Sequence, residues 1–321
     1  MNPLFSIVMP VFDGGPLLAE ALDSLRAQEP FDGSFEIVAA DDGSTDGSRE
    51  RLEEAARDLP LRVIEGARRG NWVASTNKAM DEARGEWIAF LHQDDLYRPA
   101  RLRTLAAAVR AAPDAAFFAN DTAFAAADGR PLGSWRPALR PGFSPPAAAV
   151  PPLAVQNTIA VPAVLFRRDA AAEVGGMDET LPYTADWDLW LRLAARFGVF
   201  RLAETLSVFR VHLGSQTVAL AGKRDGMRAD LETVAARSEP DLLRLLPPRL
   251  HARYRRLVRL GVETNLFLAA AGSRAPLPWR PFLRALFRCT PADWARYVRR
   301  SAVVPRTAAR LRAGFAKRRK P

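Results

Sequence analysis

The stretch FEIVAADDGSTDG, residues 35–47, decides the fold, because an apolar run passes directly into an acidic, glycine-rich loop. Its apolar half is predicted to be a strand, and Asp41 and Asp42 follow it at once. The same change recurs where the apolar run 86–91 passes into HQDD, residues 92–95. Ligands of a parallel α/β sheet bind at the carboxyl ends of its strands. The two acidic turns therefore mark the predicted binding edge.

Around this loop, roughly the first hundred residues alternate short apolar runs with longer amphipathic stretches, as βαβ units do. Leu18, Leu22 and Leu25 share one face of a predicted helix, and further helices are predicted at 49–57 and 73–83. The predicted fold class is α/β, with a mainly parallel, Rossmann-like sheet flanked by helices. The predicted strands are Phe5 to Val11, Phe35 to Ala40, Leu61 to Ile64, Glu86 to Leu91 and Ala115 to Ala119.

The second half of the chain is organised differently. Seven prolines within residues 131–152 predict an extended connection or a flap instead of a regular element. A strand at 161–166 and a tryptophan-rich helix at 186–197 are expected next. Beyond about residue 222 the pattern predicts several short basic helices.

Composition limits the class of protein. With 48% hydrophobic and 26% charged residues, the 321-residue chain is typical of a soluble globular protein and of neither a disordered chain nor a disulfide scaffold. Cys289, the single cysteine, can close no internal bridge. No secretory signal is visible, so a cytoplasmic location is expected. The longest uncharged run, 141–166, contains six prolines and is not expected to span a membrane.

Positive charge is concentrated at the end of the chain. Residues 249–321 hold 19 basic and 2 acidic side chains, whereas residues 1–248 hold 27 and 34. Around Trp279 and Phe287, arginines alternate with apolar residues as in an interfacial amphipathic helix. The expected partner is an anionic membrane surface on the cytoplasmic side, and a merely solvated helical surface is the alternative. Nucleic acid is not expected, because no recognised nucleic-acid module accompanies the charge.

Two carboxylate clusters on neighbouring strand ends would repel each other unless a cation or a donor-rich ligand compensated them. A divalent ion on a diphosphate meets that need, since Mg²⁺ or Mn²⁺ takes one or two protein carboxylates and completes its shell with phosphate and water. Asp94 is the first candidate for its ligand. Ordinary turn and helix-capping chemistry is the alternative for these loops.

Five segments come in order over roughly residues 4–215: SIVMPVFDGG from Ser6, EIVAADDGSTDGS from Glu36, FLHQDDLYRP from Phe90, VLFRRDAAAEVGGMDETLPYTADWDLWLRLA from Val164, and FRVH from Phe209. Together they resemble family 2 glycosyltransferases of the GT-A fold. The resemblance implies transfer of a sugar from a nucleotide diphosphate donor to a saccharide or lipid-linked acceptor hydroxyl, usually with inversion. It also implies a GT-A region at 1–222, with a nucleotide-sugar half at about 1–130 and an acceptor half at about 150–222. Residues 223–321 would form a basic helical extension.

The resemblance also implies roles for individual residues. Pro10 and Phe12 would lie beside the base, and Asp42 would accept a hydrogen bond from the imide of uracil or thymine, which favours UDP- or dTDP-sugars. Asp94 matches the second acid of the metal-binding DxD motif, and His92 replaces the first. Imidazole can also bind such a metal.

Two further matches complete the expected site. Asp186 matches the carboxylate that deprotonates the acceptor, and His212 matches a position near the metal and diphosphate. Asp186 also begins a helix and could cap it, and Trp190 is expected in the core. A non-catalytic sugar-nucleotide-binding protein with a degenerate metal site is the alternative function. No phosphate-loop, HExxH, CxxC or GxGxxG pattern competes.

Overall fold

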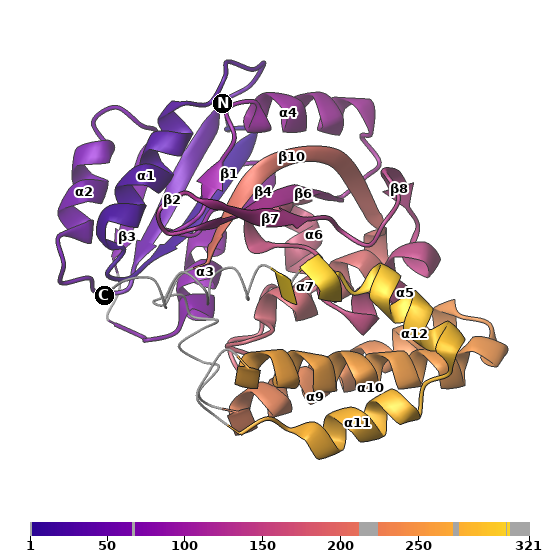
Figure 1. Cartoon of the computed structure of the whole chain (residues 1–321). Coiled ribbons are helices and arrows are strands. Elements are labelled where there is room, and N and C mark those ends of the chain that lie inside the picture. Colours follow the sequence, from indigo (N-terminus) through magenta and orange to yellow (C-terminus); the bar gives the residue numbers. More distant parts are fainter. Residues whose placement is uncertain (1, 66–67, 212–223, 272–275, 306, 309–321) are drawn as a thin grey trace.

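The computed structural model describes residues 2–65, 68–211, 224–271, 276–305 and 307–308 (Figure 1). The strands are β1 (Phe5–Val11), β2 (Phe35–Asp41), β3 (Leu61–Glu65), β4 (Trp87–Phe90), β5 (Leu96–Tyr97), β6 (Phe117–Ala126), β7 (Pro131–Trp135), β8 (Gly142–Ser144), β9 (Val164–Arg167) and β10 (Val199–Val211). The α-helices are α1 (Gly15–Arg26), α2 (Ser48–Ala55), α3 (Trp72–Asp81), α4 (Arg101–Ala111), α5 (Pro146–Val155), α6 (Arg168–Glu173), α7 (Ala185–Phe197), α9 (Arg224–Leu245), α10 (Pro248–Ala271), α11 (Trp279–Phe287) and α12 (Pro291–Arg300). A 3₁₀ turn, η1 (Val161–Ala163), precedes β9.

One sheet of ten strands organises the described residues, in the order β3-β2-β1-β4-β9-β6-β10-β5, with β7 on β6 and β8 on β10. The first four strands of that order are parallel, and β9 runs antiparallel between β4 and β6. The carboxyl ends of β1, β2 and β4 therefore lie at one edge of the sheet (Figure 1). This confirms the predicted α/β class.

The predicted strands agree closely with the observed ones, because most of them are buried apolar runs. β1 has the predicted bounds, and β2 and β3 are each one residue longer than expected. The fifth predicted strand begins at Phe117 and continues to Ala126 as β6. Of the strand expected at 161–166, residues 161–163 form η1 instead, and β9 begins at Val164 and ends at Arg167.

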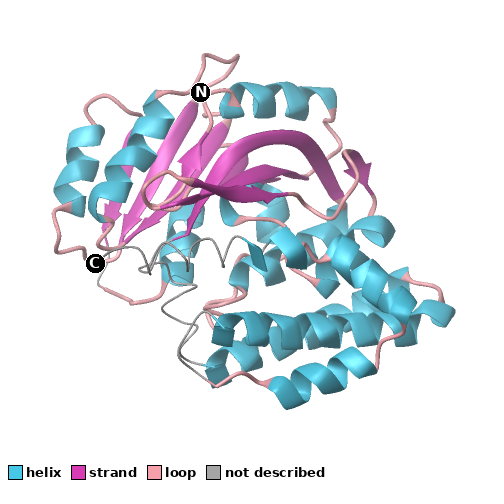
Figure 2. Ribbon diagram, in the orientation of Figure 1, coloured by secondary structure: helices cyan, strands magenta, loops and turns pink. Residues whose placement is uncertain are grey.

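Helices cover both faces of the sheet (Figure 2). On one face α1, α2 and α4 bury Leu18, Leu52 and Leu105 with the alternate side chains of β1. On the other face α3, α5, α6 and α7 join a second cluster that includes Trp190, which is fully buried as expected. The two layers leave the carboxyl edge of the parallel strands to be lined by loops.

The expectation of an extended connection at 131–152 is wrong. That segment contains β7, β8 and the start of α5, a helix with Pro146 in its first turn and Pro151 and Pro152 inside it. The lost hydrogen bonds are outweighed by burial, since Val150 through Val155 are all buried against α7, α9 and α10. Across the described ranges, no helix is both long and apolar enough to cross a membrane.

The chain after residue 223 is helical, as predicted, but α9 and α10 are 22 and 24 residues long and are not short. They pack on α5 and α7 and bury Leu231, Leu257 and Leu260 in the same cluster as the sheet. At one point the backbones nearly touch: a Cβ at Gly261 of α10 would lie 2.1 Å from the carbonyl oxygen of Val155 in α5. Only glycine fits there.

Candidate active site

The residues expected beside the base lie at the carboxyl end of β1. Pro10 is buried within the strand, opposite Ala40 of β2. The Phe12 backbone is held by the Gln93 side chain, whose Oε1 accepts from the Phe12 N–H at 2.8 Å while its Nε2 donates to the Phe12 oxygen at 2.9 Å. The Arg68 guanidinium lies 4.4 Å from the centre of the Phe12 ring. The first strand end is thus tied to the second acidic turn.

Asp42 is 7% exposed, and its two carboxylate oxygens accept hydrogen bonds from the backbone N–H groups of Arg69 and Gly70, at 2.7 and 2.8 Å. Its neighbour Asp41 accepts from both the N–H and the hydroxyl of Ser44. Donors therefore compensate the charge of this loop. A carboxylate has about four lone-pair directions, so Asp42 can accept a further donor.

The loops after β1 and β2 are also joined directly. Asp13 has a φ of 45°, and its Oδ1 accepts from the N–H of Thr45 at 2.8 Å. The N–H of Gly14 donates to the Ser48 hydroxyl at 2.9 Å, and the N–H of Gly15 donates to the Asp46 carboxylate at 2.8 Å. These hydrogen bonds hold the acidic loop after β2 against the loop after β1 at the carboxyl edge of the sheet.

The second acidic turn is fastened from β10. Asp95 is 1% exposed, and its Oδ1 accepts from the N–H of Arg210 at 2.9 Å. Burial, together with Asp94, raises the pKa of Asp95 well above its ordinary value. The buried Arg210 guanidinium donates to the backbone carbonyl oxygen of Asp94, to that of Leu17 at 3.0 Å, and to the Glu20 carboxylate at 2.5 Å. Arg210, in the FRVH segment, is a positioning residue that the sequence did not reveal.

His92 is the first residue of this turn, and its side chain lies against α3. Its ring meets the Trp72 ring edge-on at a centroid distance of 5.2 Å, and burial lowers its pKa against the opposing charge of Asp94. His92 Nε2 is buried and has no hydrogen-bond partner. A neutral, unpartnered imidazole nitrogen next to Asp94 fits a divalent cation on a diphosphate, which needs only one or two protein ligands. Within the described ranges, no group of three His, Cys, Asp or Glu side chains converges on a metal position. His212 lies outside the described residues.

Asp186 is in the first turn of α7, whose N-cap, Thr184, makes no side-chain cap bond. Burial raises the pKa of Asp186 to about 6, although hydrogen bonds from the backbone N–H of Trp187, from Asn157 and from its own N–H lower it. The Asn157 amide donates to Oδ2 at 2.9 Å. The carboxyl thus contacts the helix end and is nevertheless poised to take a proton near neutral pH.

The loop that leads to Asp186 is held on one side by α3. Trp72 Nε1 donates to the Pro182 oxygen at 2.8 Å, so Trp72 contacts both this loop and His92. The Asn77 amide exchanges two hydrogen bonds with the Met177 backbone, at 2.8 and 3.1 Å. Residues of α3 therefore position the segment that leads to Asp186.

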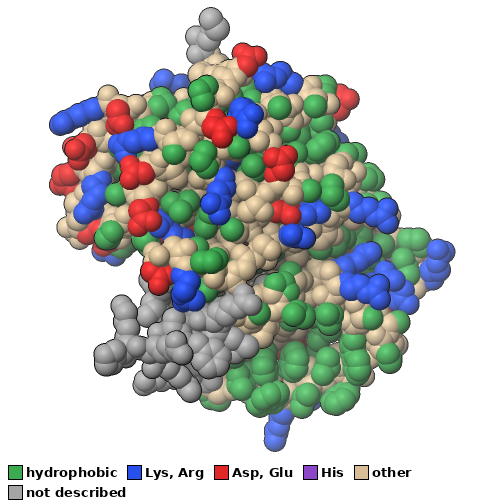
Figure 3. Space-filling view, turned by 45° about the horizontal axis from the view of Figure 1, so that its top comes forward, with side chains coloured by type: hydrophobic (Ala, Val, Ile, Leu, Met, Phe, Trp, Pro, Cys, Tyr) green, Lys and Arg blue, Asp and Glu red, His purple; other side chains and the backbone are tan. Residues whose placement is uncertain are grey.

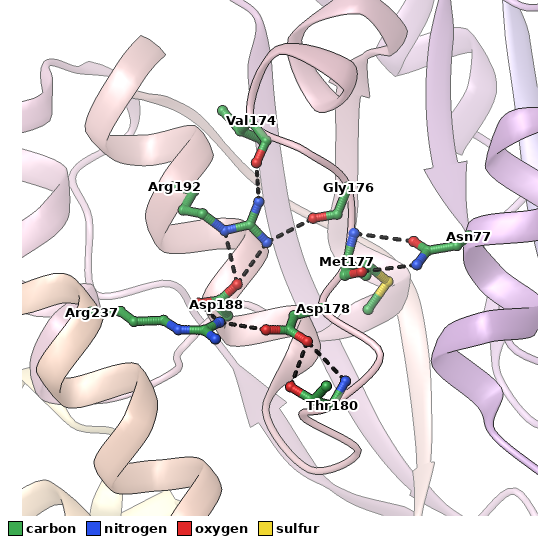
Figure 4. A network of polar contacts seen from close by, with 9 residues as sticks. All are labelled: Asn77, Val174, Gly176, Met177, Asp178, Thr180, Asp188, Arg192 and Arg237. Atoms are coloured by element: carbon green, nitrogen blue, oxygen red, sulfur yellow. Dashed lines mark hydrogen bonds and ion pairs between the residues drawn. The ribbon is translucent and has the colours of Figure 1, made fainter.

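Figure 4 shows how the same loop is held from the opposite side. Arg192 of α7 binds the buried Asp188 at 2.6 Å and the oxygen of Gly176 at 2.7 Å. Arg237 of α9 binds Asp178 at 2.6 Å and lies 3.7 Å from Asp188. The i, i+4 spacing of Asp188 and Arg192 could have indicated that pair from sequence, but nothing local indicates the contact from α9.

A mainly parallel sheet with acidic turns at its carboxyl edge, and a carboxyl of raised pKa at the start of the following helical layer, has the architecture of a GT-A glycosyltransferase. The chain belongs to glycosyl transferase family 2, whose model matches residues 6–174, more than half of the sequence.

Two curated relatives illustrate the range of similarity. An uncharacterized protein of Mycobacterium tuberculosis is 28% identical over 310 residues, which cover 91% of this chain and 95% of that one. The O-antigen biosynthesis protein RfbC of Myxococcus xanthus is 30% identical over 248 residues, 74% of this chain but 18% of RfbC. The chain thus spans nearly the whole of the first relative and less than a fifth of the second.

Solved structures share the fold. Residues 1–349 of S. aureus TarS, in complex with UDP-GlcNAc, align with a TM-score of 0.62 at 15% identity, covering 98% of this chain and 92% of that segment. The mannosyltransferase PcManGT from Pyrobaculum calidifontis, in complex with GDP-Man and Mn²⁺, aligns with a TM-score of 0.55 at 16% identity, covering 97% and 88%. At these identities the likeness establishes the fold alone.

Proposed function

We propose that the protein is an inverting glycosyltransferase that moves a hexosyl or deoxyhexosyl group from a UDP- or dTDP-sugar to an acceptor hydroxyl. The observation that carries this proposal is the Asp186 carboxyl, held by Asn157 with a pKa of about 6. A general base works best when its pKa lies near the operating pH. A purely structural capping aspartate would gain nothing from a raised pKa.

The donor would bind along the carboxyl edge of the parallel strands. Pro10 and Phe12 would lie against the base, and Asp42 would accept from the imide of uracil or thymine with a lone pair that Arg69 and Gly70 leave available. Asp94 and His92 would hold Mg²⁺ or Mn²⁺, and His212 is proposed as a further ligand. The metal would neutralise the charge that develops on the departing diphosphate.

Asp186 would then remove the proton from the acceptor hydroxyl as its oxygen attacks the anomeric carbon on the face opposite the diphosphate. The bond from the new oxygen forms while the bond to the diphosphate oxygen breaks, which inverts the configuration without a covalent sugar-enzyme intermediate. Asn157 orients the Asp186 carboxylate by donating to its Oδ2, and the carboxylate would take the proton.

The proposal extends to the setting of the reaction. Peripheral binding at the cytoplasmic face of a membrane and a saccharide or lipid-linked acceptor would fit synthesis of cell-surface polysaccharide or glycolipid. The similarity to a protein named for O-antigen biosynthesis supports that setting. We also propose the division into a glycosyltransferase region at 1–222 and a basic helical region at 223–321.

The test begins with a panel of UDP-, dTDP-, GDP- and CDP-sugars, with and without Mn²⁺ or Mg²⁺. Ligands that bind the folded chain raise its melting temperature. Transfer is then measured by release of the nucleoside diphosphate, and the product's anomeric configuration by NMR. Metal-dependent stabilisation without turnover on any acceptor would favour a non-catalytic sugar-nucleotide-binding protein. A retained anomeric configuration would refute inversion.

A further inference from the structure

In the described part of the chain, most of the exposed large apolar side chains lie in α11, α12 and the residues just after them. Seven such residues are exposed, and six of them lie between residues 279 and 304. The seventh is Phe143, on β8. The six are Trp279, Leu283, Phe287, Trp294, Val298 and Val304. An apolar cluster of this kind marks an interaction surface more often than scattered single residues do.

The exposed residues of α11 form a regular stripe. Trp279, Leu283 and Phe287 are four residues apart, so they share one face of the helix, and they are 52%, 38% and 73% exposed. The opposite face is already used, since Ala285 is buried and the Phe282 ring lies 4.7 Å from the Phe267 ring of α10. Trp279 also contacts the Phe267 ring, at a centroid distance of 4.7 Å, so Leu283 and Phe287 are the members of the stripe that face outward without such a ring contact.

A second stripe runs beside the first. Arg280, Arg284 and Arg288 follow each apolar residue by one position and are exposed. Asp293 is the only acidic residue in the whole segment 276–305, and it is fully buried. No ion pair involves the three arginines among the described residues. In Figure 3, hydrophobic side chains cover much of the lower part of the molecule, with Lys and Arg beside them and no Asp or Glu visible among them.

Other arginines of the basic region serve the fold. Arg253 and Arg256 of α10 bind Asp293, at 3.1 and 2.8 Å, and Arg259 binds Glu263 at 2.9 Å. The charge that is counted after residue 249 is thus divided in two. Four arginines of α10, at positions 253, 255, 256 and 259, form ion pairs within the protein, whereas those of α11 are exposed beside the apolar stripe.

We propose that α11 and α12 form a docking face that binds an anionic lipid bilayer, with Trp279, Leu283, Phe287, Trp294 and Val298 entering the headgroup region. The three α11 arginines would lie at the level of the lipid phosphates. Tryptophan, aliphatic and arginine side chains in adjacent stripes are the chemistry of an interfacial helix. A second copy of the chain fits less well, because a symmetric contact would bring the arginine stripes together.

The proposal rests on the membrane partner proposed above, but not on the transfer reaction. Point variants of the full chain are the appropriate test, because α10 contributes Leu257 and Leu260 to the core and its removal would expose them. The apolar variant is Leu283→Ser with Phe287→Ser and Val298→Ser, which leaves the contact of Trp279 with Phe267 in place. The charge variant is Arg280→Gln with Arg284→Gln and Arg288→Gln.

Flotation with phosphatidylcholine vesicles, with and without phosphatidylglycerol, measures the partition coefficient. The apolar variant should lose about a hundredfold on anionic vesicles. The charge variant should lose about a hundredfold at low salt and should no longer prefer phosphatidylglycerol. Phe143→Ser, and Arg103→Gln with Arg110→Gln on α4, are matched exposed controls that should partition like wild type.

Donor affinity and turnover on a soluble acceptor should be unchanged in both docking-face variants, so failure of the docking proposal is distinguishable from failure of the proposed reaction. Wild-type protein that stays with the soluble fraction on anionic vesicles at low salt would overturn the proposal. So would docking-face variants that float as wild type does. A wild-type dimer that the apolar variant dissociates in light scattering, without vesicle binding, would assign the face to a second copy instead.

Discussion

Replacing Asp186 by asparagine is expected to raise the free energy of unfolding at neutral pH while it lowers turnover. Burial raises the pKa of this carboxyl from 3.8 to about 6. One pKa unit corresponds to about 1.4 kcal/mol, so the ionised carboxylate costs the folded chain about 3 kcal/mol at neutral pH. Asparagine resembles the protonated acid and can still accept the hydrogen bond from Asn157. We expect the variant to be more stable by about 1 to 3 kcal/mol.

The pH dependence of unfolding separately tests the predicted direction of the stability difference between wild type and Asp186→Asn. Because the folded-state pKa of Asp186 lies above the unfolded value, the folded chain binds more protons between about pH 4 and pH 6. Wild type should therefore lose stability relative to Asp186→Asn as the pH rises through that window. The difference should vanish below about pH 4 and stay constant above about pH 6. Urea unfolding at a series of pH values measures it.

Activity should move in the opposite direction. Loss of a positioned general base lowers turnover on the order of a hundredfold or more, and donor affinity by calorimetry should change little. The pH profile of kcat/KM should rise with a pKa of about 6 in wild type and lose that limb in the variant. Asp188→Asn is the matched control on the same helix, and it should destabilise the fold because it leaves Arg192 without its carboxylate.

If Asp186→Asn instead destabilised the protein and weakened donor binding as much as turnover, the carboxylate would be a helix cap. Its role as the base would then be refuted. A stability gain without any loss of turnover would refute the role of Asp186 as the general base, but it would agree with a raised pKa of its carboxyl in the folded chain.

Substitutions at four further residues test the rest of the site. Asp94→Asn should abolish transfer and greatly weaken metal-dependent donor binding, whereas His92→Ala should do less; full turnover of Asp94→Asn at ordinary metal concentrations would show that the metal is held elsewhere. Calorimetry should find UDP and TDP bound more tightly than CDP, and Asp42→Ala should remove the preference; tighter binding of CDP would contradict the imide contact. Arg237→Ala should lower turnover about tenfold with donor affinity unchanged, because the loop before the base loses its support from α9; Arg237→Lys should restore part of it, and an equal loss of donor affinity would argue against the positioning role.

The sheet could be predicted from sequence because its strands are short, buried apolar runs with clear polar ends. β1 was predicted to the residue, and the acidic turns at Asp42 and Asp94 follow directly from where β2 and β4 end. Antiparallel β9 was expected as a strand, but its insertion between β4 and β6 was not, because pairing partners are not encoded in one strand's pattern.

The parts that escaped prediction depend on distant contacts. Arg210 meets Asp95 across 115 positions of sequence, and Asp230 accepts from the Tyr183 N–H across 47. The helix around Pro151 defied its local signal because tertiary burial outweighed the missing donors. The count of basic residues after 249 likewise does not show that Arg256 and Arg259 of α10 form ion pairs with Asp293 and Glu263.

Gly261 has a consequence for how this chain can be recombined with its relatives. The α10 backbone lies so close to the Val155 carbonyl that any side chain at residue 261 would push the helix outward. Because α11 packs on α10, it would be displaced together with it. A chimera that grafts the C-terminal helices of another family member onto this sheet would therefore need a glycine at that crossing, or the donor's own α5. Sequence exchange across the boundary is therefore constrained at one backbone contact, between residue 261 and Val155.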